Sequence, residues 1–224
     1  MRFTEARFVG AFLDLPHCPN DRPGILFSGR SNVGKSTVLN RFAGRTLART
    51  SRTPGRTRQL IYYAMRAEKL PPFYLVDLPG YGYASGARSE REKFARAVRS
   101  LLAAPDRIAA ILQLVDVSVP WQDPDLEMLE WLLEGDIPFA LVFTKADRVN
   151  NAGPARRLAE LVKLLPWREE IPVLPTSGRE NEGIVGVRKF VGRVLQRPPG
   201  SATWDFMPGG KPSAAEDDGS STSV

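Results

Sequence analysis

Several residue types are scarce in this chain of 224 residues, and each scarcity excludes a class of site. Cys18 is the single cysteine, so no disulfide can form within the chain, which is typical of a protein in the reducing cytoplasm. His17 is the single histidine, which excludes metal sites made of several histidines and any catalytic triad that does not use His17 itself. Both residues lie in a Pro-rich lead-in, and we interpret them as structural.

Long apolar runs are missing as well. No run approaches the roughly 20 residues that a membrane-spanning helix needs. The N-terminal segment MRFTEARFVG has charges where a signal peptide would have its apolar segment. We therefore expect a cytoplasmic globular protein that binds no membrane, with an ordinary composition of 42% hydrophobic and 25% charged residues.

Acidic residues are absent between Asp21 and Glu68. This interval is rich in Lys and Arg, so it predicts a positive field that attracts polyanions. A solvated face that supports one bound nucleotide is the alternative, but nucleotide phosphates need fewer cations, and we favour contact with nucleic acid. The cations of the interval are Arg22, Arg30, Lys35, Arg41, Arg45, Arg49, Arg52, Arg56, Arg58 and Arg66.

Short apolar runs alternate with helical patterns, which is typical of an α/β fold with a mostly parallel sheet and helices on both faces. We expect a lead-in over 1–22, a nucleotide-binding domain over 23–197 and a disordered tail over 198–224. The six predicted strands are 24–29, 60–65, 73–77, 108–116, 139–144 and 171–175. The first predicted helix is 34–43, and a second follows a capping box at Ser89 and Glu92. A third begins at Asp123 and has the apolar stripe Leu126, Leu129 and Leu133. Two more helices are predicted from apolar stripes over 158–165 and 184–194.

The segment ILFSGRSNVGKST contains the pattern G-x-x-x-x-G-K-[ST] between a predicted strand and a predicted helix, which is the context of a P-loop. Gly29 and Gly34 let the backbone curl so that several N–H groups face phosphate oxygens at the helix start. Lys35 would reach the β- and γ-phosphates, and the Ser36 hydroxyl would bind Mg²⁺.

Three later segments favour GTP over ATP. Asp77 of DLPG can hold a water bound to Mg²⁺, while the N–H of Gly80 meets the γ-phosphate. The Asp147 carboxylate of TKAD can accept two hydrogen bonds from guanine N1 and N2, which adenine cannot donate. Thr176 and Ser177 follow the last predicted strand and can offer a backbone N–H to guanine O6.

The ordered set GRSNVGKS, TPGRT, DLPGYGYA, TKAD and PTS resembles the EngB (YihA/YsxC) family of bacterial ribosome-biogenesis GTP-binding proteins, over about residues 4–195. The resemblance implies a Ras-like P-loop GTPase fold with a six-stranded sheet, Mg²⁺-dependent binding of GTP and GDP, and weak GTPase activity. It also implies a role in assembly of the large ribosomal subunit and in normal cell division and septation. The partner would be that subunit or its precursor, contacted through ribosomal RNA by the basic residues of 41–58, and the protein would be a monomer.

On this resemblance, Thr57 of TPGRT becomes the switch residue that meets Mg²⁺ and the γ-phosphate. The catalytic residues would be Lys35, Thr57 and Gly80, and the metal ligands Ser36, Thr57 and Asp77. The full set of nucleotide-binding residues would be Gly29, Arg30, Ser31, Asn32, Val33, Gly34, Lys35, Ser36, Thr37, Gly55, Arg56, Thr57, Asp77, Leu78, Pro79, Gly80, Thr144, Lys145, Ala146, Asp147, Thr176, Ser177 and Gly178.

Two segments depart from the family pattern. Ser85 stands where the family usually has Lys after GYGYA, and residues 117–120 replace the Arg-His-Pro that often follows the residue equivalent to Asp116. These departures put partner contacts at those side chains in question, but they leave the nucleotide site intact.

Tyr81 follows DLPG, where Ras-like enzymes often have a glutamine that orients the attacking water. A phenol with a pKa of about 10 is a poor base, and its rigid ring does not mimic a glutamine amide. We therefore expect slow hydrolysis in the isolated protein and a packing or partner-facing role for Tyr81. Asn32 either holds K⁺ beside the phosphates or only shapes the P-loop. A P-loop kinase and a module that binds GTP without useful turnover are the alternative functions.

Overall fold

The computed structural model describes residues 1–48, 59–81, 100, 107–134, 137–150, 152–164, 171–177 and 183–197. The strands in these ranges are β1 (Phe3–Phe12), β2 (Gly24–Gly29), β3 (Leu60–Ala67), β4 (Phe73–Asp77), β5 (Ile108–Asp116), β6 (Phe139–Thr144) and β7 (Val173–Pro175). The helices are α1 (Lys35–Ala43), α3 (Asp123–Glu134), α4 (Gly153–Leu164) and α5 (Ile184–Leu195), with short 3-10 helices η1 (Leu15–His17) and η3 (Ala146–Arg148). Several predictions lie outside the described residues: the helix after Ser89, the position of Ser85, the site residues Gly55, Arg56, Thr57 and Gly178, and the tail.

The described strands form one sheet in the order β1-β3-β4-β2-β5-β6-β7. The prediction of six strands is therefore wrong, since the sheet has seven within the described ranges. The additional strand is β1, which pairs with β3 in antiparallel fashion. Its sequence gives no apolar run, because Ala6 is its one fully buried residue and most of its neighbours remain exposed or half-buried. The β3–β4 pair is also antiparallel, whereas the four remaining pairs, from β4 to β7, are parallel.

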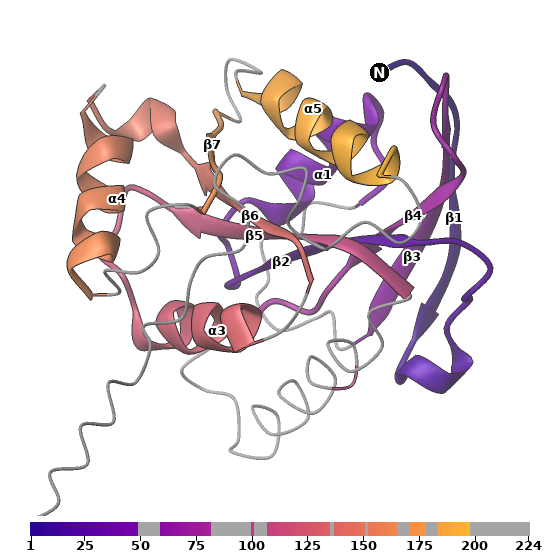
Figure 1. Cartoon of the computed structure of the whole chain (residues 1–224), viewed down its shortest axis with the longest axis horizontal. Helices are drawn as coiled ribbons and strands as arrows, with labels where there is room; N and C mark the ends of the chain where they lie inside the picture. Colours follow the sequence, from indigo (N-terminus) through magenta and orange to yellow (C-terminus); the bar gives the residue numbers. More distant parts are fainter. Residues whose placement is uncertain are drawn as a thin grey trace, which may run out of the picture.

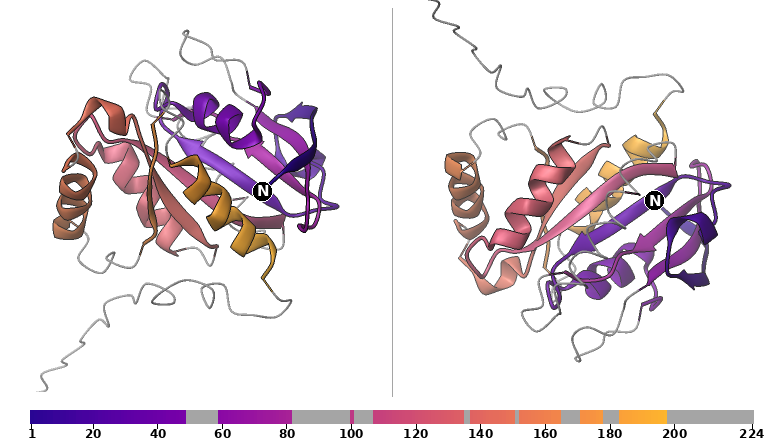
Figure 2. Two further views of the ribbon diagram at one scale, coloured as in Figure 1. Left: turned by 90° about the horizontal axis from the view of Figure 1, so that it is seen from above. Right: turned by 90° about the horizontal axis from the view of Figure 1, so that it is seen from below.

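Helices cover both faces of this sheet, as the sequence predicts. Figure 1 shows α1 and α5 above the sheet and α3 below it. The views from above and below in Figure 2 agree, with α1 and α5 in front in one view and α3 in front in the other. The carboxyl ends of the parallel strands β2, β4, β5 and β6 therefore meet at one edge between these helical layers, which is where ligands bind in open α/β sheets.

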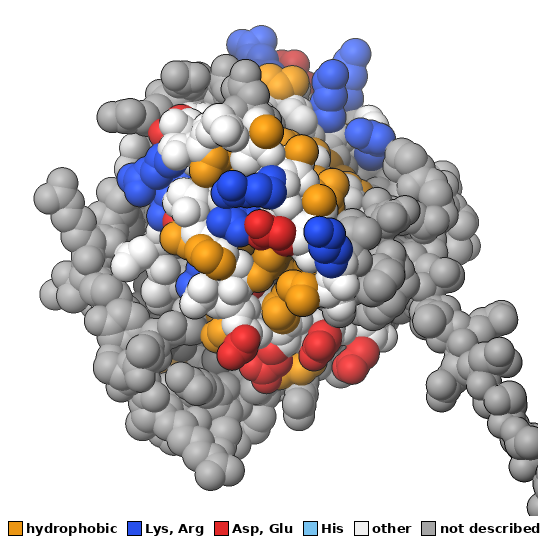
Figure 3. Space-filling model, turned by 90° about the vertical axis from the view of Figure 1, so that its left-hand side faces the viewer, with side chains coloured by type: hydrophobic (Ala, Val, Ile, Leu, Met, Phe, Trp, Pro, Cys, Tyr) orange, Lys and Arg blue, Asp and Glu red, His pale blue; other side chains and the backbone are white. Residues whose placement is uncertain are grey.

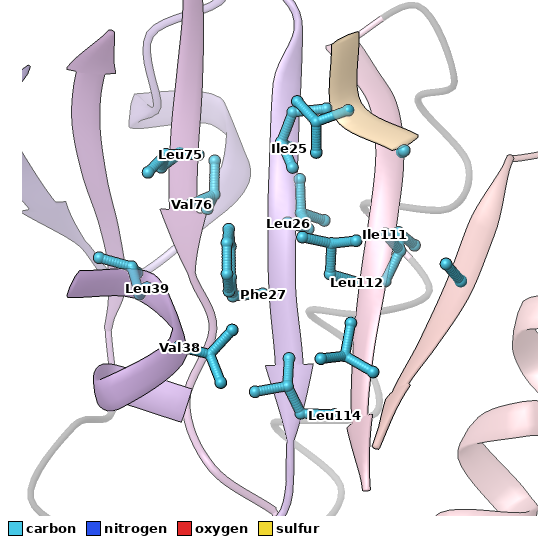
Figure 4. Packing of buried hydrophobic residues seen from close by; sticks show 14 of the residues in the cluster. Ile25, Leu26, Phe27, Val38, Leu39, Leu75, Val76, Ile111, Leu112 and Leu114 are labelled. Atoms are coloured by element: carbon cyan, nitrogen blue, oxygen red, sulfur yellow. The ribbon is translucent and has the colours of Figure 1, made fainter. Parts of the chain in front are cut away.

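The core lies along the central strands. Figure 4 shows the side chains of Leu26 and Phe27 on β2 among those of the neighbouring strands β4 and β5 and of α1. Phe27 and Phe42 are both fully buried and meet edge to face, with ring centroids 5.9 Å apart. Burial of each such side chain contributes about 1.5–3 kcal/mol, so the strand that carries the P-loop is held rigidly.

The buried side of α3 differs from the predicted stripe. Leu129 is fully buried, but Leu126 and Leu133 are half-buried, and the other fully buried residues are Asp125, Met128 and Leu132. The helix is therefore rotated so that a carboxylate faces the interior in place of a leucine.

The lone histidine and cysteine have local partners. His17 Nδ1 lies 2.5 Å from Asp14 Oδ1, and the Cys18 thiol donates to the Asp14 carbonyl oxygen at 3.2 Å. Burial raises the pKa of the Cys18 thiol, which agrees with a structural role. In the described ranges no helix is both long and apolar enough to cross a lipid bilayer.

Candidate functional site

The turn between β2 and α1 has the geometry of a P-loop. The N–H of Val33 donates to the carbonyl oxygen of Arg30 at 3.2 Å. Asn32 and Gly34 both adopt left-handed backbone conformations, with φ values of 64° and 106°. Asparagine and glycine tolerate this region better than other residues, so the local sequence suits the turn. The first N–H groups of α1 are thereby directed toward a place where an anion can bind.

Lys35 and Asp77 form an ion pair beside this turn. Lys35 is the first residue of α1, Asp77 is the last residue of β4, and their side chains are only 12% and 6% exposed. The two motifs that contain them therefore meet in space as the sequence predicts.

The oxygens near this pair suit Mg²⁺. The Ser36 hydroxyl and the Asp77 carboxylate are hard oxygen ligands, and Mg²⁺ in nucleotide sites is typically held by one or two protein oxygens together with phosphates and waters. Thr57, the third predicted ligand, lies outside the described residues.

The TKAD segment is bonded directly to the P-loop. Thr144 Oγ1 donates to the carbonyl oxygen of Val33 at 2.6 Å, and Lys145 Nζ donates to that of Asn32 at 3.0 Å. The same ammonium group lies 2.5 Å from Asp116 Oδ2. Burial raises the pKa of Asp116, but hydrogen bonds from Lys145 and Ser118 lower it more, so the carboxyl titrates below its ordinary range. Asp116 is not among the predicted site residues, although its position at the carboxyl end of a central strand is a signal for a site role.

The predicted base-binding residue Asp147 is half-buried and held by the loop after β7. Ser177 Oγ donates to Asp147 Oδ1 at 3.0 Å. Backbone hydrogen bonds join the two loops. The N–H of Thr176 donates to the carbonyl oxygen of Phe143 at 2.6 Å, and the N–H of Ala146 donates to the carbonyl oxygen of Thr176 at 3.2 Å. Such contacts fix the direction of the carboxylate before any base arrives.

Gly80 lies directly against the P-loop. A Cβ added to Gly80 would lie 3.0 Å from Ser31 Oγ and 3.1 Å from its Cα, so only glycine fits without displacement. The N–H of Ser31 donates to the carbonyl oxygen of Tyr81 at 3.0 Å. DLPG is thereby placed beside the phosphate-binding turn.

The Tyr81 side chain points into the protein. Its hydroxyl donates to Asp125 Oδ1 at 3.1 Å and accepts from Gln113 Nε2 at 2.5 Å. Tyr81 is only 8% exposed, and burial raises its pKa well above the ordinary value. The packing role expected for Tyr81 is therefore the one the structure supports, and its hydroxyl is directed away from solvent.

A cavity of about 370 Å³ opens beside the P-loop, on the side of the segment that departs from the family pattern. Val119 and Pro120 of that segment line it together with Asn32 and Lys145.

Figure 3 shows one side of the molecule, with Lys and Arg side chains around its centre and upper part and a row of acidic side chains along its lower part.

Part of the predicted positive field is neutralised by acids that are distant in sequence. Arg30 pairs with Asp125 and Arg66 with Glu5, in addition to the pair made by Lys35. Arg41 and Arg45 are exposed, whereas Arg49, Arg52, Arg56 and Arg58 lie outside the described residues.

Comparisons with known proteins agree with this geometry. A family model described as "50S ribosome-binding GTPase" matches residues 24–145. The chain is 38% identical over 172 residues to a "Probable GTP-binding protein EngB" of Thermotoga maritima, which covers 77% of this chain and 86% of that protein.

Solved structures show the same fold. The crystal structure of a probable GTP-binding protein engB is 24% identical, has a TM-score of 0.59, and covers 77% of this chain and 98% of that chain. Era in complex with MgGDPNP and a segment of 16S ribosomal RNA is 21% identical, with a TM-score of 0.63 over 87% of this chain and 60% of that chain. The chain thus has a Ras-like P-loop fold; it belongs to the EngB family of GTP-binding proteins, and it is a GTPase.

Proposed function

We propose that this chain is a slow, Mg²⁺-dependent GTPase switch that acts in assembly of the large ribosomal subunit. The observation that carries the first half of the proposal is the inward direction of Tyr81. Its hydroxyl is bonded to Asp125 and Gln113, so no side chain at this position orients an attacking water.

The roles of the nucleotide-binding residues follow from their places. Lys35 binds the β- and γ-phosphates once its bond to Asp77 is exchanged for the nucleotide. Asp147, held by Ser177, accepts from guanine N1 and N2. Ser36 and Asp77 hold Mg²⁺, which neutralises phosphate charge when bound. The backbone N–H of Gly80 meets the γ-phosphate, and Thr57 joins the same site.

A monovalent cation completes the charge balance in this proposal. Asn32 has its left-handed backbone at the centre of the P-loop, and its side-chain oxygen is a suitable ligand for K⁺. K⁺ would add positive charge as negative charge develops during phosphoryl transfer.

The ribosomal partner is supported by the family and by charge. The matching family model is described as a 50S ribosome-binding GTPase, and this description supports the choice of the large subunit. The structural neighbour Era is complexed with a segment of 16S ribosomal RNA, which supports contact with RNA in general. Arg41 and Arg45 are exposed at the start of the basic interval 41–58, and in this proposal they belong to the surface that binds RNA. The proposal places the protein in the cytoplasm as a monomer, with cell division and septation affected through ribosome supply.

Phosphate release with and without purified large ribosomal subunits tests the proposal. Large subunits are expected to raise the rate by about tenfold or more, because a partner that completes a GTPase site raises turnover by orders of magnitude. Small subunits at the same concentration and salt are the matched control. A rate that is slow and equal in all three mixtures would favour the module that holds GTP without useful turnover.

A further inference from the structure

Asp125 is a buried carboxylate that none of the nucleotide-binding motifs contains. It lies in the first turn of α3 and is 1% exposed, on the helix side that also buries Met128 and Leu129. A charged group in such a place needs partners, because desolvation of an unpaired carboxylate is costly. The partners of Asp125 come from the two segments that flank the phosphate site.

The first partner is in the P-loop. Arg30 Nε lies 2.9 Å from Asp125 Oδ2, and the side chain of Arg30 is only 21% exposed. The N–H of Arg30 is not well aligned with this oxygen, so the attraction is that of an ion pair rather than of a straight hydrogen bond. Arg30 immediately precedes Ser31, against which Gly80 packs.

The second partner follows Gly80 in the chain. The Tyr81 hydroxyl donates to the other oxygen of Asp125, at 3.1 Å, and accepts a hydrogen bond from Gln113 of β5. The backbone of Tyr81 pairs with Arg30 as a parallel β-bridge, through the bond from Ser31 N–H to the Tyr81 carbonyl oxygen. One carboxylate therefore contacts both segments through side chains, while those segments also contact each other through backbone.

This arrangement makes the position of Gly80 depend on α3, a helix that carries none of the nucleotide-binding motifs. Loss of the Asp125 charge would leave Arg30 without its buried counter-ion and weaken the hold on the Tyr81 hydroxyl. Both effects would loosen the contact of Gly80 with Ser31. GDP has no γ-phosphate, so only GTP binding depends on the Gly80 N–H.

We propose that Asp125 is a positioning residue for GTP: by holding Arg30 and Tyr81 it sets Gly80 at the distance that the γ-phosphate requires. The inference rests on the proposed function, since it takes Gly80 as the group that meets the γ-phosphate.

Equilibrium binding of a non-hydrolysable GTP analogue and of GDP to four proteins tests this inference. They are the wild type, Asp125→Asn, Tyr81→Phe and the control Glu127→Gln, which makes the same acid-to-amide change on an exposed residue of the same helix. Asp125→Asn is expected to weaken the analogue about tenfold and GDP less than about twofold, a coupling within the usual range. Tyr81→Phe should also weaken the GTP analogue more than GDP. Glu127→Gln should leave both affinities unchanged.

A purely structural role gives a different result. The thermal unfolding temperature would then be lower in Asp125→Asn and Tyr81→Phe, but the ratio of GTP-analogue affinity to GDP affinity would stay at its wild-type value. This result would overturn the inference. If Asp125→Asn does not fold, Tyr81→Phe decides alone, since it removes one hydroxyl. The matching ATP analogue is measured on the wild type in the same assay. If the wild type does not prefer the GTP analogue over the ATP analogue, the assignment of the nucleotide pocket fails instead, so the two failures are distinguishable.

Discussion

The hydroxyl of Ser177 donates a hydrogen bond of 3.0 Å to the carboxylate of Asp147, and this bond joins the last loop of the sheet to the TKAD segment. Asp147 is thereby oriented for two donors of one base edge, which guanine has and adenine lacks. The nucleotide pocket should therefore be specific for guanine.

Asp147→Asn should lose GTP affinity by about 100-fold or more, because a site built for two donors then presents a donor of its own to guanine. Xanthosine triphosphate, which has an acceptor in place of the guanine amino group, should gain affinity in the same variant. Competition binding with GTP, ATP and xanthosine triphosphate measures both changes. Unaltered GTP affinity in Asp147→Asn would show that this loop does not recognise the base.

The ion pair of Lys35 and Asp77 leads to a prediction about phosphate binding. Lys35→Ala should weaken both GTP and GDP by about 100-fold or more, since it removes a largely buried charge from the phosphate site. The exposed Lys189→Ala is the matched control and should bind as the wild type does. Titration with a fluorescent nucleotide distinguishes the two variants, and comparable affinities would contradict the P-loop assignment.

The ion pair of Asp116 and Lys145 should make the free energy of unfolding depend on pH. The folded pKa of Asp116 lies below its unfolded value, so its ionised form contributes stability that is fully present above about pH 4 and is lost as the pH falls through the folded pKa. Asp116→Asn should therefore cost about 1–3 kcal/mol at neutral pH and progressively less below about pH 4.

Urea unfolding of the wild type, Asp116→Asn and the exposed control Glu130→Gln across this range measures the difference. A difference between wild type and Asp116→Asn that stays constant down to the acid limit of folding would argue against the ion pair. Glu130→Gln should show little difference at any pH.

The two interpretations of Asn32 are separated by the choice of salt. If its side chain holds K⁺, hydrolysis should be faster in K⁺ than in Na⁺ at equal ionic strength. Asn32→Gly keeps the left-handed backbone available and removes only the side chain, so it should abolish the difference between the salts. Equal wild-type rates in the two salts would leave Asn32 with a role in the shape of the loop alone.

The parts of the site that could be predicted are those carried by contiguous motifs. Gly34, Lys35 and Ser36 are placed by one local turn, and Asp77 and Asp147 by the ends of buried strands, so spacing along the chain is enough to find them. The mostly parallel sheet and the helices on both its faces follow from the same alternation of apolar runs and helical stripes.

The parts that sequence reasoning missed depend on contacts between distant segments. Asp125 belongs to the pattern of α3 only as an acid in its first turn, and its burial depends on Arg30 and Tyr81, which lie far from it in the chain. β1 was missed for a related reason. Its strand state depends on hydrogen bonds with β3, and its single buried residue gives no apolar run.

Co-sedimentation with purified large ribosomal subunits tests the central claim most directly. The protein should be retained with a non-hydrolysable GTP analogue and released with GDP, and the retained fraction should fall as salt rises, because cationic residues bind the RNA phosphates. Small subunits in parallel control for nonspecific attraction to RNA. Equal retention with the GTP analogue, with GDP and without nucleotide, or equal retention on both subunits, would contradict a nucleotide-controlled role at the large subunit.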